Sequence, residues 1–283
     1  MNSKSKDLMK VGFGIATMFA LAWLFTFFIV KHLPISDNLK SLIGSVVLYT
    51  IGLGVFLLIT KDVVGENYKK GKVSSNTILI CFLLQFTALL VFTLVKGLTV
   101  SITKDTSVER NNLSPYMLFS LLIFAPVLEE FVLRHLFAKK LLKHSTSFYI
   151  LVSSFCFSFV HGVSLGIPSI VYTFILGLIW SYLLVKTGDL KISIVFHSLS
   201  NLFGGILTQM LLGVSDEIFS IYFLLVIVLG LAGLILFIKN RKDFTVDGKV
   251  FGRENLKEVF SNPGILFFVI LTVVVMVLKG LSF

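Results

Sequence analysis

Charged residues are scarce in this chain of 283 residues. Asp, Glu, Lys and Arg make up 14% of it, whereas an average soluble globular protein has about 25%. The charges lie in short clusters between long apolar runs, and 56% of all residues are hydrophobic. This pattern excludes an ordinary soluble domain. It predicts an all-α polytopic membrane helix bundle, with one membrane domain over residues 1–283.

Cysteine and several catalytic motifs are also scarce or missing. The two cysteines, Cys81 and Cys156, lie inside apolar runs, without a Cys-x-x-Cys pair or a Cys/His cluster. We therefore expect buried free thiols that pack as small hydrophobic side chains. The His-Glu-x-x-His zinc-protease signature is absent, and the lack of a Gly-rich phosphate loop argues against an energised transporter.

Apolar runs of roughly 20 residues predict the membrane spans. The runs cover residues 11–31, 42–60, 77–100, 116–138, 148–165, 168–186, 191–213 and 218–238, and a ninth candidate covers 264–282. No small-x-small cleavage site follows the first run, so we expect a retained helix and not a signal peptide. We expect the polar segment 239–262 to be a cytoplasmic linker, with a cytoplasmic amphipathic helix as the alternative.

Basic residues give the chain a net charge of +10. They flank the apolar runs, so topology explains them better than nucleic acid, and we expect no nucleic-acid partner. Lys-rich segments alternate with poorer loops, such as the third loop with only Lys104 and Arg110. The alternation predicts a cytoplasmic N-terminus. A short Lys-rich chain suits a bacterial plasma membrane.

The run 116–138 carries three ionisable residues, Glu129, Glu130 and Arg134, inside a predicted membrane span. Ionisable groups within a membrane are energetically costly, so these residues are candidates for a functional site. Glu130 and Arg134 are four residues apart, so they share a helix face and can pair. Glu129 is rotated about 100° from Glu130 and can point elsewhere. Pro126 frees a backbone carbonyl just upstream and can kink the helix. A purely structural ion network is the alternative explanation.

Two further runs carry histidines. His161 ends the motif Phe157-x-x-x-His161, and His197 shares a helix face with Asn201, four residues later. A glutamate and a histidine can hold and deprotonate a water, while a second histidine and an amide can donate hydrogen bonds to an oxyanion. The same Glu/His/His set could instead bind zinc. Both arrangements point to hydrolysis inside a membrane cavity.

The motifs resemble those of the CAAX-protease and bacteriocin-processing family of intramembrane proteases, also called the Abi family, which includes the type II CAAX prenyl endopeptidase. The family pattern is Glu-Glu-x-x-x-Arg, then Phe-x-x-x-His, then His-x-x-x-Asn or Asp. In this chain the same motifs occur in the same order, as Glu129-Glu130-x-x-x-Arg134, Phe157-x-x-x-His161 and His197-x-x-x-Asn201. The resemblance covers residues 114–213 and implies that these residues form the catalytic core.

The resemblance also implies roles for these residues. Glu129 and His161 would activate the attacking water, and His197 and Asn201 would stabilise the oxyanion. Glu130, Arg134 and Phe157 would shape the site. Family members have been described as glutamate-dependent proteases and as metalloproteases, so a zinc ion held by Glu129, His161 and His197 stays open as a cofactor. The implied substrate is a membrane peptide or a lipidated protein in the lipid bilayer.

Other functions compete with this one. Residues 162–166 match the Gly-x-Ser-x-Gly nucleophile elbow, but that motif needs a strand-turn-helix context. A serine protease using Ser164 and His197 would leave the carboxylates unused. A non-proteolytic membrane regulator or bacteriocin-immunity partner on the same fold is an alternative. An ion-coupled carrier is a further one, although no inverted repeat is visible.

The two motif histidines differ in their predicted depth. In this topology His161 falls near the outer end of its helix and His197 near the inner end of its own. They meet only if the helices are offset, tilted or broken. A third histidine, His135, follows the motif arginine, and we expect an interfacial histidine there.

Overall fold

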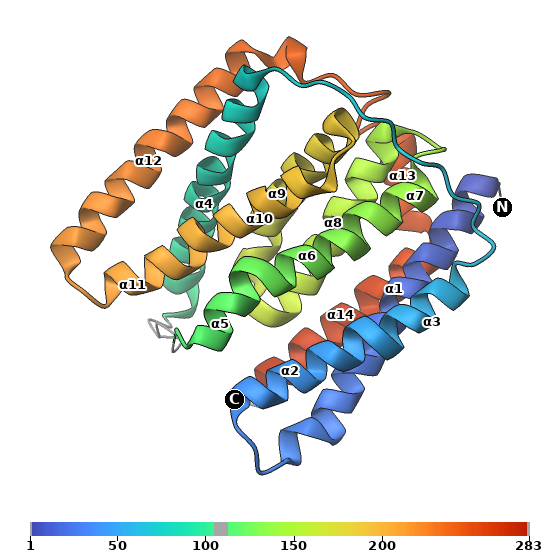
Figure 1. Ribbon diagram of the computed structural model, residues 1–283, viewed down its shortest axis with the longest axis horizontal. Coiled ribbons are helices and arrows are strands. Elements are labelled where there is room, and N and C mark those ends of the chain that lie inside the picture. The colour runs from blue at the N-terminus through green and yellow to red at the C-terminus, as the bar shows by residue number, and fades with distance from the viewer. Residues whose placement is uncertain (1, 105–112, 282–283) are drawn as a thin grey trace. The chain divides into compact units, whose positions relative to one another are not determined.

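The computed structural model describes residues 2–104 and 113–281, so Arg110 of the third loop lies outside the described residues. Within these ranges the regular elements are all helices, which confirms the all-α prediction (Figure 1). Eight helices of the described chain are long and apolar enough to cross a membrane, and they coincide with the eight predicted runs. The protein is therefore an integral membrane protein.

Helical elements of three kinds follow one another along the chain. The α-helices are α1 (Ser3–Phe28), α2 (Asp37–Val47), α3 (Leu53–Ile59), α4 (Ser75–Thr103), α5 (Pro115–Phe119), α6 (Ala125–Glu130), α7 (Phe137–Leu141), α8 (Thr146–Leu165), α9 (Ile167–Thr187), α10 (Leu190–Ser200), α11 (Thr208–Leu212), α12 (Asp216–Lys239), α13 (Arg253–Ser261) and α14 (Pro263–Leu281). The π-helical segments are η2 (Leu48–Gly52), η3 (Ser120–Phe124), η4 (Phe131–Leu136) and η5 (Asn201–Leu207). The 3₁₀ turns are η1 (Val30–His32) and η6 (Arg241–Asp243).

Serine residues fix where several spans begin. Ser36, Ser74, Ser114 and Ser215 each precede a helix, and each hydroxyl accepts a hydrogen bond from the backbone N–H three residues later. A serine at this position satisfies a donor that the first helical turn leaves unpaired. The polar boundaries of the apolar runs therefore also act as helix start signals.

The described residues group into two compact units. The first comprises Met1–Asn67, Leu136–Tyr149 and Gly248–Phe283, and the second comprises Tyr68–His135 and Ile150–Asp247. One membrane domain over the whole chain stays a prediction. All the candidate catalytic residues lie in the second unit.

The first unit is built on α1, which packs against α3 and α14. The backbones of α1 and α14 touch, because a Cβ added to Gly12 would lie 2.4 Å from the carbonyl carbon of Gly264. Lys4 on α1 donates to Asn255 on α13 over 3.0 Å. Residues 253–261 form helix α13. Our prediction of a linker throughout 239–262 is therefore wrong for its second half. The pair α13 and α14 is bent by 64°, and it forms a ninth span if taken as one.

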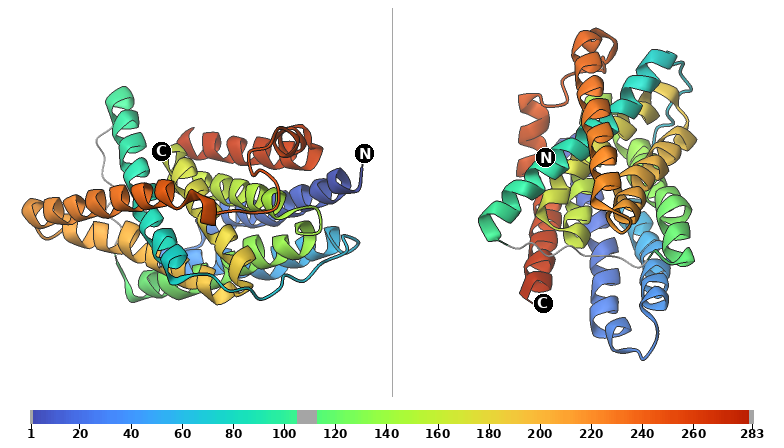
Figure 2. Two further views of the ribbon diagram at one scale, coloured as in Figure 1. Left: turned by 90° about the horizontal axis from the view of Figure 1, so that it is seen from above. Right: turned by 90° about the vertical axis from the view of Figure 1, so that its left-hand side faces the viewer.

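The second unit contains a long pair of helices, α4 and α12, which cross in contact (Figure 2). Small residues allow the contact, because a Cβ added to Gly233 would lie 2.7 Å from the backbone of Leu83. Thr87 donates to the carbonyl of Gly230 over 2.7 Å and so ties the two backbones together. Helix α4 also packs on α9, which in turn packs on α10.

π-helical segments interrupt two of the spans in this unit. η3 and η4 flank α6, and η5 follows α10 directly. Such segments are frequent at functional sites, because the inserted residue changes which carbonyls are paired. Pro126 lies at the junction of η3 and α6, inside the continuous span Pro115–Leu141, so the carbonyl of Leu122 that its missing N–H leaves unpaired lies in η3. The two helices α6 and α10 run side by side (Figure 1), so both interruptions lie near the carboxylates.

Candidate active site

Three helices bring their polar side chains to one carboxylate oxygen. His161 on α8 places its Nε2 atom 3.4 Å from Oε2 of Glu129 on α6. His197 on α10 places its own Nε2 3.8 Å from the same oxygen. The two histidines therefore meet, although their positions along their helices differ.

The proton on His161 can be assigned from its neighbours. Its Nδ1 lies 3.0 Å from the backbone oxygen of Phe157, one helical turn earlier. A carbonyl oxygen only accepts hydrogen bonds, so Nδ1 must carry the proton and donate it. In the neutral ring Nε2 then has a free lone pair, and that lone pair faces Glu129.

His197 is held in the same tautomer by the second carboxylate. Its Nδ1 lies 3.1 Å from Oε1 of Glu130. The other oxygen of Glu130 lies 3.3 Å from Nε of Arg134, the pair that the i,i+4 spacing predicts. Both side chains of this pair are fully buried. A carboxylate paired with an arginine only accepts hydrogen bonds, so Nδ1 of His197 donates to Glu130 and Nε2 of the neutral ring keeps its lone pair.

Three acceptors therefore converge at Glu129. The two imidazole lone pairs and the carboxylate oxygen repel one another unless a donor lies between them. Oε2 of Glu129 is buried and has no hydrogen-bond partner among the described residues. A metal ion could bind all three, whereas a water could donate to two of them and a proton could bridge two. The side chain of Glu129 is 21% exposed and that of Glu130 is 0% exposed, so only the first side chain borders accessible space.

Aromatic rings form the wall of the site. The Phe157 ring centroid lies 4.2 Å from that of His161 and 5.7 Å from that of His197. Cζ of Arg134 lies 4.3 Å from the Phe157 ring centroid, a favourable cation–π distance. Phe157 is 1% exposed, so it separates the ion pair from solvent.

Sequence reasoning missed two residues that contact the site, Trp180 and Gln85. The Trp180 indole stacks on His197 with ring centroids 4.3 Å apart, and its N–H donates to Oε1 of Gln85 over 3.2 Å. Gln85 could have been found, because it is an amide inside an apolar run. No local signal marks Trp180, since its contact depends on how α9 packs against α10.

Asn201 is tied to the interrupted helix. Its Nδ2 donates to the backbone oxygen of Leu121 in η3 over 2.8 Å, and Ser198 donates to Leu122 over 2.7 Å. The amide of Asn201 has a second N–H that this bond does not use. Among the described residues Asn201 makes no hydrogen bond to Glu129 or to either histidine of the site. It lies one helical turn beyond His197 on the same face.

Two other candidates lie apart from this cluster. Nδ1 of His135 lies 2.7 Å from the Tyr68 hydroxyl, and its ring stacks on Phe131. Burial raises the pKa of Tyr68, so the phenol stays protonated and can donate to His135. Ser164 is exposed and helical near the end of α8. The strand-turn-helix context of a nucleophile elbow is absent from the described part of the chain.

The donor set has the chemistry that a zinc ion requires. Two imidazole Nε2 atoms and a carboxylate are common zinc ligands. Hydrogen bonds from the opposite ring nitrogens to acceptors, as His161 and His197 make, are the usual support of zinc-binding histidines. The donor chemistry therefore fits. As the side chains stand, no group of three or more His, Cys, Asp or Glu in the described residues is arranged to hold a metal.

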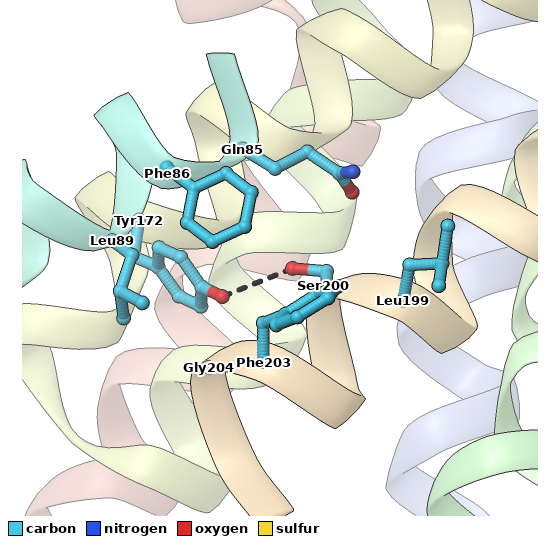
Figure 3. A pocket seen from close by; sticks show the side chains of 8 residues that line it. All are labelled: Gln85, Phe86, Leu89, Tyr172, Leu199, Ser200, Phe203 and Gly204. Carbon is cyan, nitrogen blue, oxygen red and sulfur yellow. Dashed lines mark hydrogen bonds between the residues drawn. The ribbon is translucent and has the colours of Figure 1, made fainter. Parts of the chain in front are cut away.

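A small pocket is lined by residues of α4, α9, α10 and η5 (Figure 3). It is lined by Gln85, Phe86, Leu89, Tyr172, Leu199, Ser200, Phe203 and Gly204. The hydroxyl groups of Tyr172 and Ser200 are 3.0 Å apart and share a hydrogen bond. A Cβ added to Gly204 would lie 2.6 Å from the Tyr172 hydroxyl, so a larger residue at this position would have to displace that hydroxyl.

Comparison with known proteins gives one match. Residues 111–203 match the family model described as Type II CAAX prenyl endopeptidase Rce1-like. The matched region contains Glu129, Glu130, Arg134, Phe157, His161, His197 and Asn201, and it is consistent with the CAAX-protease and bacteriocin-processing family. No curated protein and no solved structure matches the chain.

Proposed function

We propose that this chain is an intramembrane endopeptidase of the CAAX-protease type. It would hydrolyse a peptide bond in a membrane peptide or in a lipidated protein that lies in the bilayer. The convergence of two imidazole lone pairs on Oε2 of Glu129 is the observation that carries this proposal. A purely structural cluster gains nothing from three facing acceptors, whereas a site that binds and polarises water needs them.

The reaction begins with a water held between Glu129 and His161. The water donates one hydrogen bond to each, and its oxygen attacks the scissile carbonyl carbon as the Glu129–His161 pair takes up the proton. The C–N bond then breaks, and the same proton passes to the leaving amine. No acyl-enzyme forms, since the nucleophile is water.

The oxyanion requires donors on the opposite side of the carbonyl. The second amide N–H of Asn201 is one such donor. Because the Nδ1 proton of His197 is directed at Glu130 and its Nε2 carries a lone pair in the resting site, an oxyanion role for His197 would require that Nε2 take up a second proton from solvent before the attack, which makes the ring an imidazolium. The Glu130 carboxylate pairs with this imidazolium, while Arg134 offsets the charge of Glu130 in the ground state.

A zinc ion is the cofactor that this donor set would hold, with Glu129, His161 and His197 as its ligands. When bound, it would polarise the carbonyl and lower the pKa of a bound water.

The protein would lie in a bacterial plasma membrane. Its N-terminus and the segment 239–262 would both be cytoplasmic. The alternation of basic and non-basic loops supports this orientation.

Cleavage of a membrane-peptide library by the purified protein in detergent tests the function. Wild type, Glu129→Gln and the exposed control Glu217→Gln would each be assayed with and without a zinc chelator. Cleavage lost only in Glu129→Gln would support a metal-independent peptidase. Cleavage lost also on chelation, and restored by zinc, would support the metal-dependent form. A folded wild type that cleaves nothing in the library would favour a regulatory role.

A further inference from the structure

A buried amide on α4 is connected to the candidate active site through one tryptophan. Gln85 is 5% exposed, and its Oε1 accepts the hydrogen bond from Nε1 of Trp180. A buried amide at membrane depth is costly unless it is hydrogen-bonded, so this bond fixes the relative position of the two side chains. Gln85 also forms part of the pocket wall, where its amide lies at the edge nearest Ser200 and Leu199 (Figure 3).

Helix α10 contacts Trp180 at two levels. Ser193 donates to the backbone oxygen of Trp180 over 3.1 Å. His197, four residues later and on the same helix face, stacks its ring on the indole, with the ring planes inclined by only 20°. Trp180 is 1% exposed, so the indole has little freedom to change its position.

The stack controls a degree of freedom that the hydrogen bonds leave open. The bond from Nδ1 of His197 to Glu130 is a single contact at one edge of the ring, so it leaves the ring some freedom to turn about its Cβ–Cγ bond. A parallel indole at 4.3 Å permits only one ring plane. With the plane and the edge contact both fixed, Nε2 of His197 points at Glu129.

We propose that Trp180, held by Gln85, is a positioning residue that fixes the ring plane of His197. Its catalytic consequence rests on the proposed function, because it would keep His197 aimed at the reacting carbonyl. Loss of either residue would lower kcat and leave KM nearly unchanged, since neither side chain binds the substrate. A misplacement of this kind lowers kcat by roughly 10- to 100-fold.

Matched substitutions are available in this chain. Gln85→Met keeps the length of the side chain without the acceptor, and Trp180→Phe keeps a ring without the N–H donor. The controls are Gln209→Met, at an amide oxygen without a hydrogen-bond partner among the described residues, and Trp23→Phe, which affects the only other tryptophan. The double variant Gln85→Met/Trp180→Phe should be no slower than Trp180→Phe alone, because both changes remove one hydrogen bond.

An NMR measurement tests the arrangement without relying on cleavage. In protein labelled with ¹⁵N-histidine, the His197 signals are those lost in His197→Ala. We expect them to shift in Gln85→Met and in Trp180→Phe, and to stay in place in Gln209→Met and Trp23→Phe. Unshifted His197 signals in both test variants would overturn the proposal, and so would wild-type kcat in a folded Gln85→Met. A shift without any cleavage by wild type would support the positioning and contradict the proposed function.

Discussion

Each compact unit contains, among its described residues, a cluster of acidic, basic and histidine side chains. In the first unit, Oδ2 of Asp7 accepts from Lys143 over 2.7 Å and from His144 over 3.0 Å. In the second unit, Oε2 of Glu129 faces the lone pairs of His161 and His197. The residue types are similar, but the balance of donors and acceptors differs.

That difference separates a structural cluster from a reactive one. At Asp7 each donor meets an acceptor, so the cluster ties α1 to the segment after α7 and needs nothing more. At Glu129 the acceptors outnumber the donors, so the cluster is satisfied only by something that enters it. The degree of burial alone would not have distinguished the two clusters, since the side chains of Asp7 and Glu129 are similarly buried, at 13% and 21% exposed.

The largest effect expected from changing a histidine is the loss of cleavage in His161→Ala. The substitution removes one of the two groups that hold the water, so we expect kcat to fall by about 100- to 10,000-fold. Steady-state cleavage of the best library peptide measures it. His144→Ala, at the matching histidine of the Asp7 cluster, is the control. If His144→Ala and His161→Ala cleaved the peptide at the same rate, the proposed difference between a structural and a reactive cluster would be contradicted.

Arg134→Met tests the buried ion pair. It leaves the Glu130 carboxylate without its fully buried partner, so we expect unfolding free energy to fall by about 3–5 kcal/mol. Thermal unfolding in detergent would show this as a lower midpoint. Glu130→Gln/Arg134→Met should recover most of the stability, because no unpaired charge remains. If Arg134→Met alone were as stable as wild type, the assigned pairing of Glu130 with Arg134 would be contradicted.

Asp7→Asn should act on stability alone. It weakens the bonds to Lys143 and His144 at a partly exposed site, so a loss of about 1 kcal/mol in unfolding free energy is expected. We expect kcat to remain that of wild type, measured on the same peptide as for His161→Ala. A strong loss of cleavage in a folded variant would show that the Asp7 cluster also contributes to the reaction.

The smallest expected effect is that of Ser164→Ala. Ser164 is exposed at the end of α8 and contacts neither cluster, so kcat should stay within about twofold of wild type, as for a typical surface change. Complete loss of cleavage in this variant, together with trapping of the wild type by a serine-directed reagent, would favour the serine-protease alternative.

Much of this molecule could be predicted from its sequence. Apolar runs located the eight spans, because a bilayer requires long uninterrupted apolar helices. Buried charges at helical spacing located the pair Glu130 and Arg134, because the i,i+4 geometry is local. The meeting of Glu129, His161 and His197 was inferred from polar groups on three separate runs and from the family resemblance, because no local spacing brings three helices together.

Other features depend on tertiary packing and had no local signal. Trp180 contacts His197 because α9 packs on α10, and nothing in the run 168–186 indicates which residue does so. The π-helical segment η3 lies where a neighbouring helix supplies donors to its backbone carbonyls, since Asn201 and Ser198 donate to Leu121 and Leu122. Helix α13 lies in a polar segment, where apolar run length carries no information.

The central claim is that unmatched acceptors at Glu129 form the hydrolytic site. Its most direct test measures cleavage and thermal stability of Glu129→Gln beside wild type. The amide of the variant can donate to the Nε2 atoms of His161 and His197. We therefore predict that cleavage is abolished while the unfolding temperature stays the same or rises. A Glu129→Gln protein that still cleaves at the wild-type rate would contradict the claim.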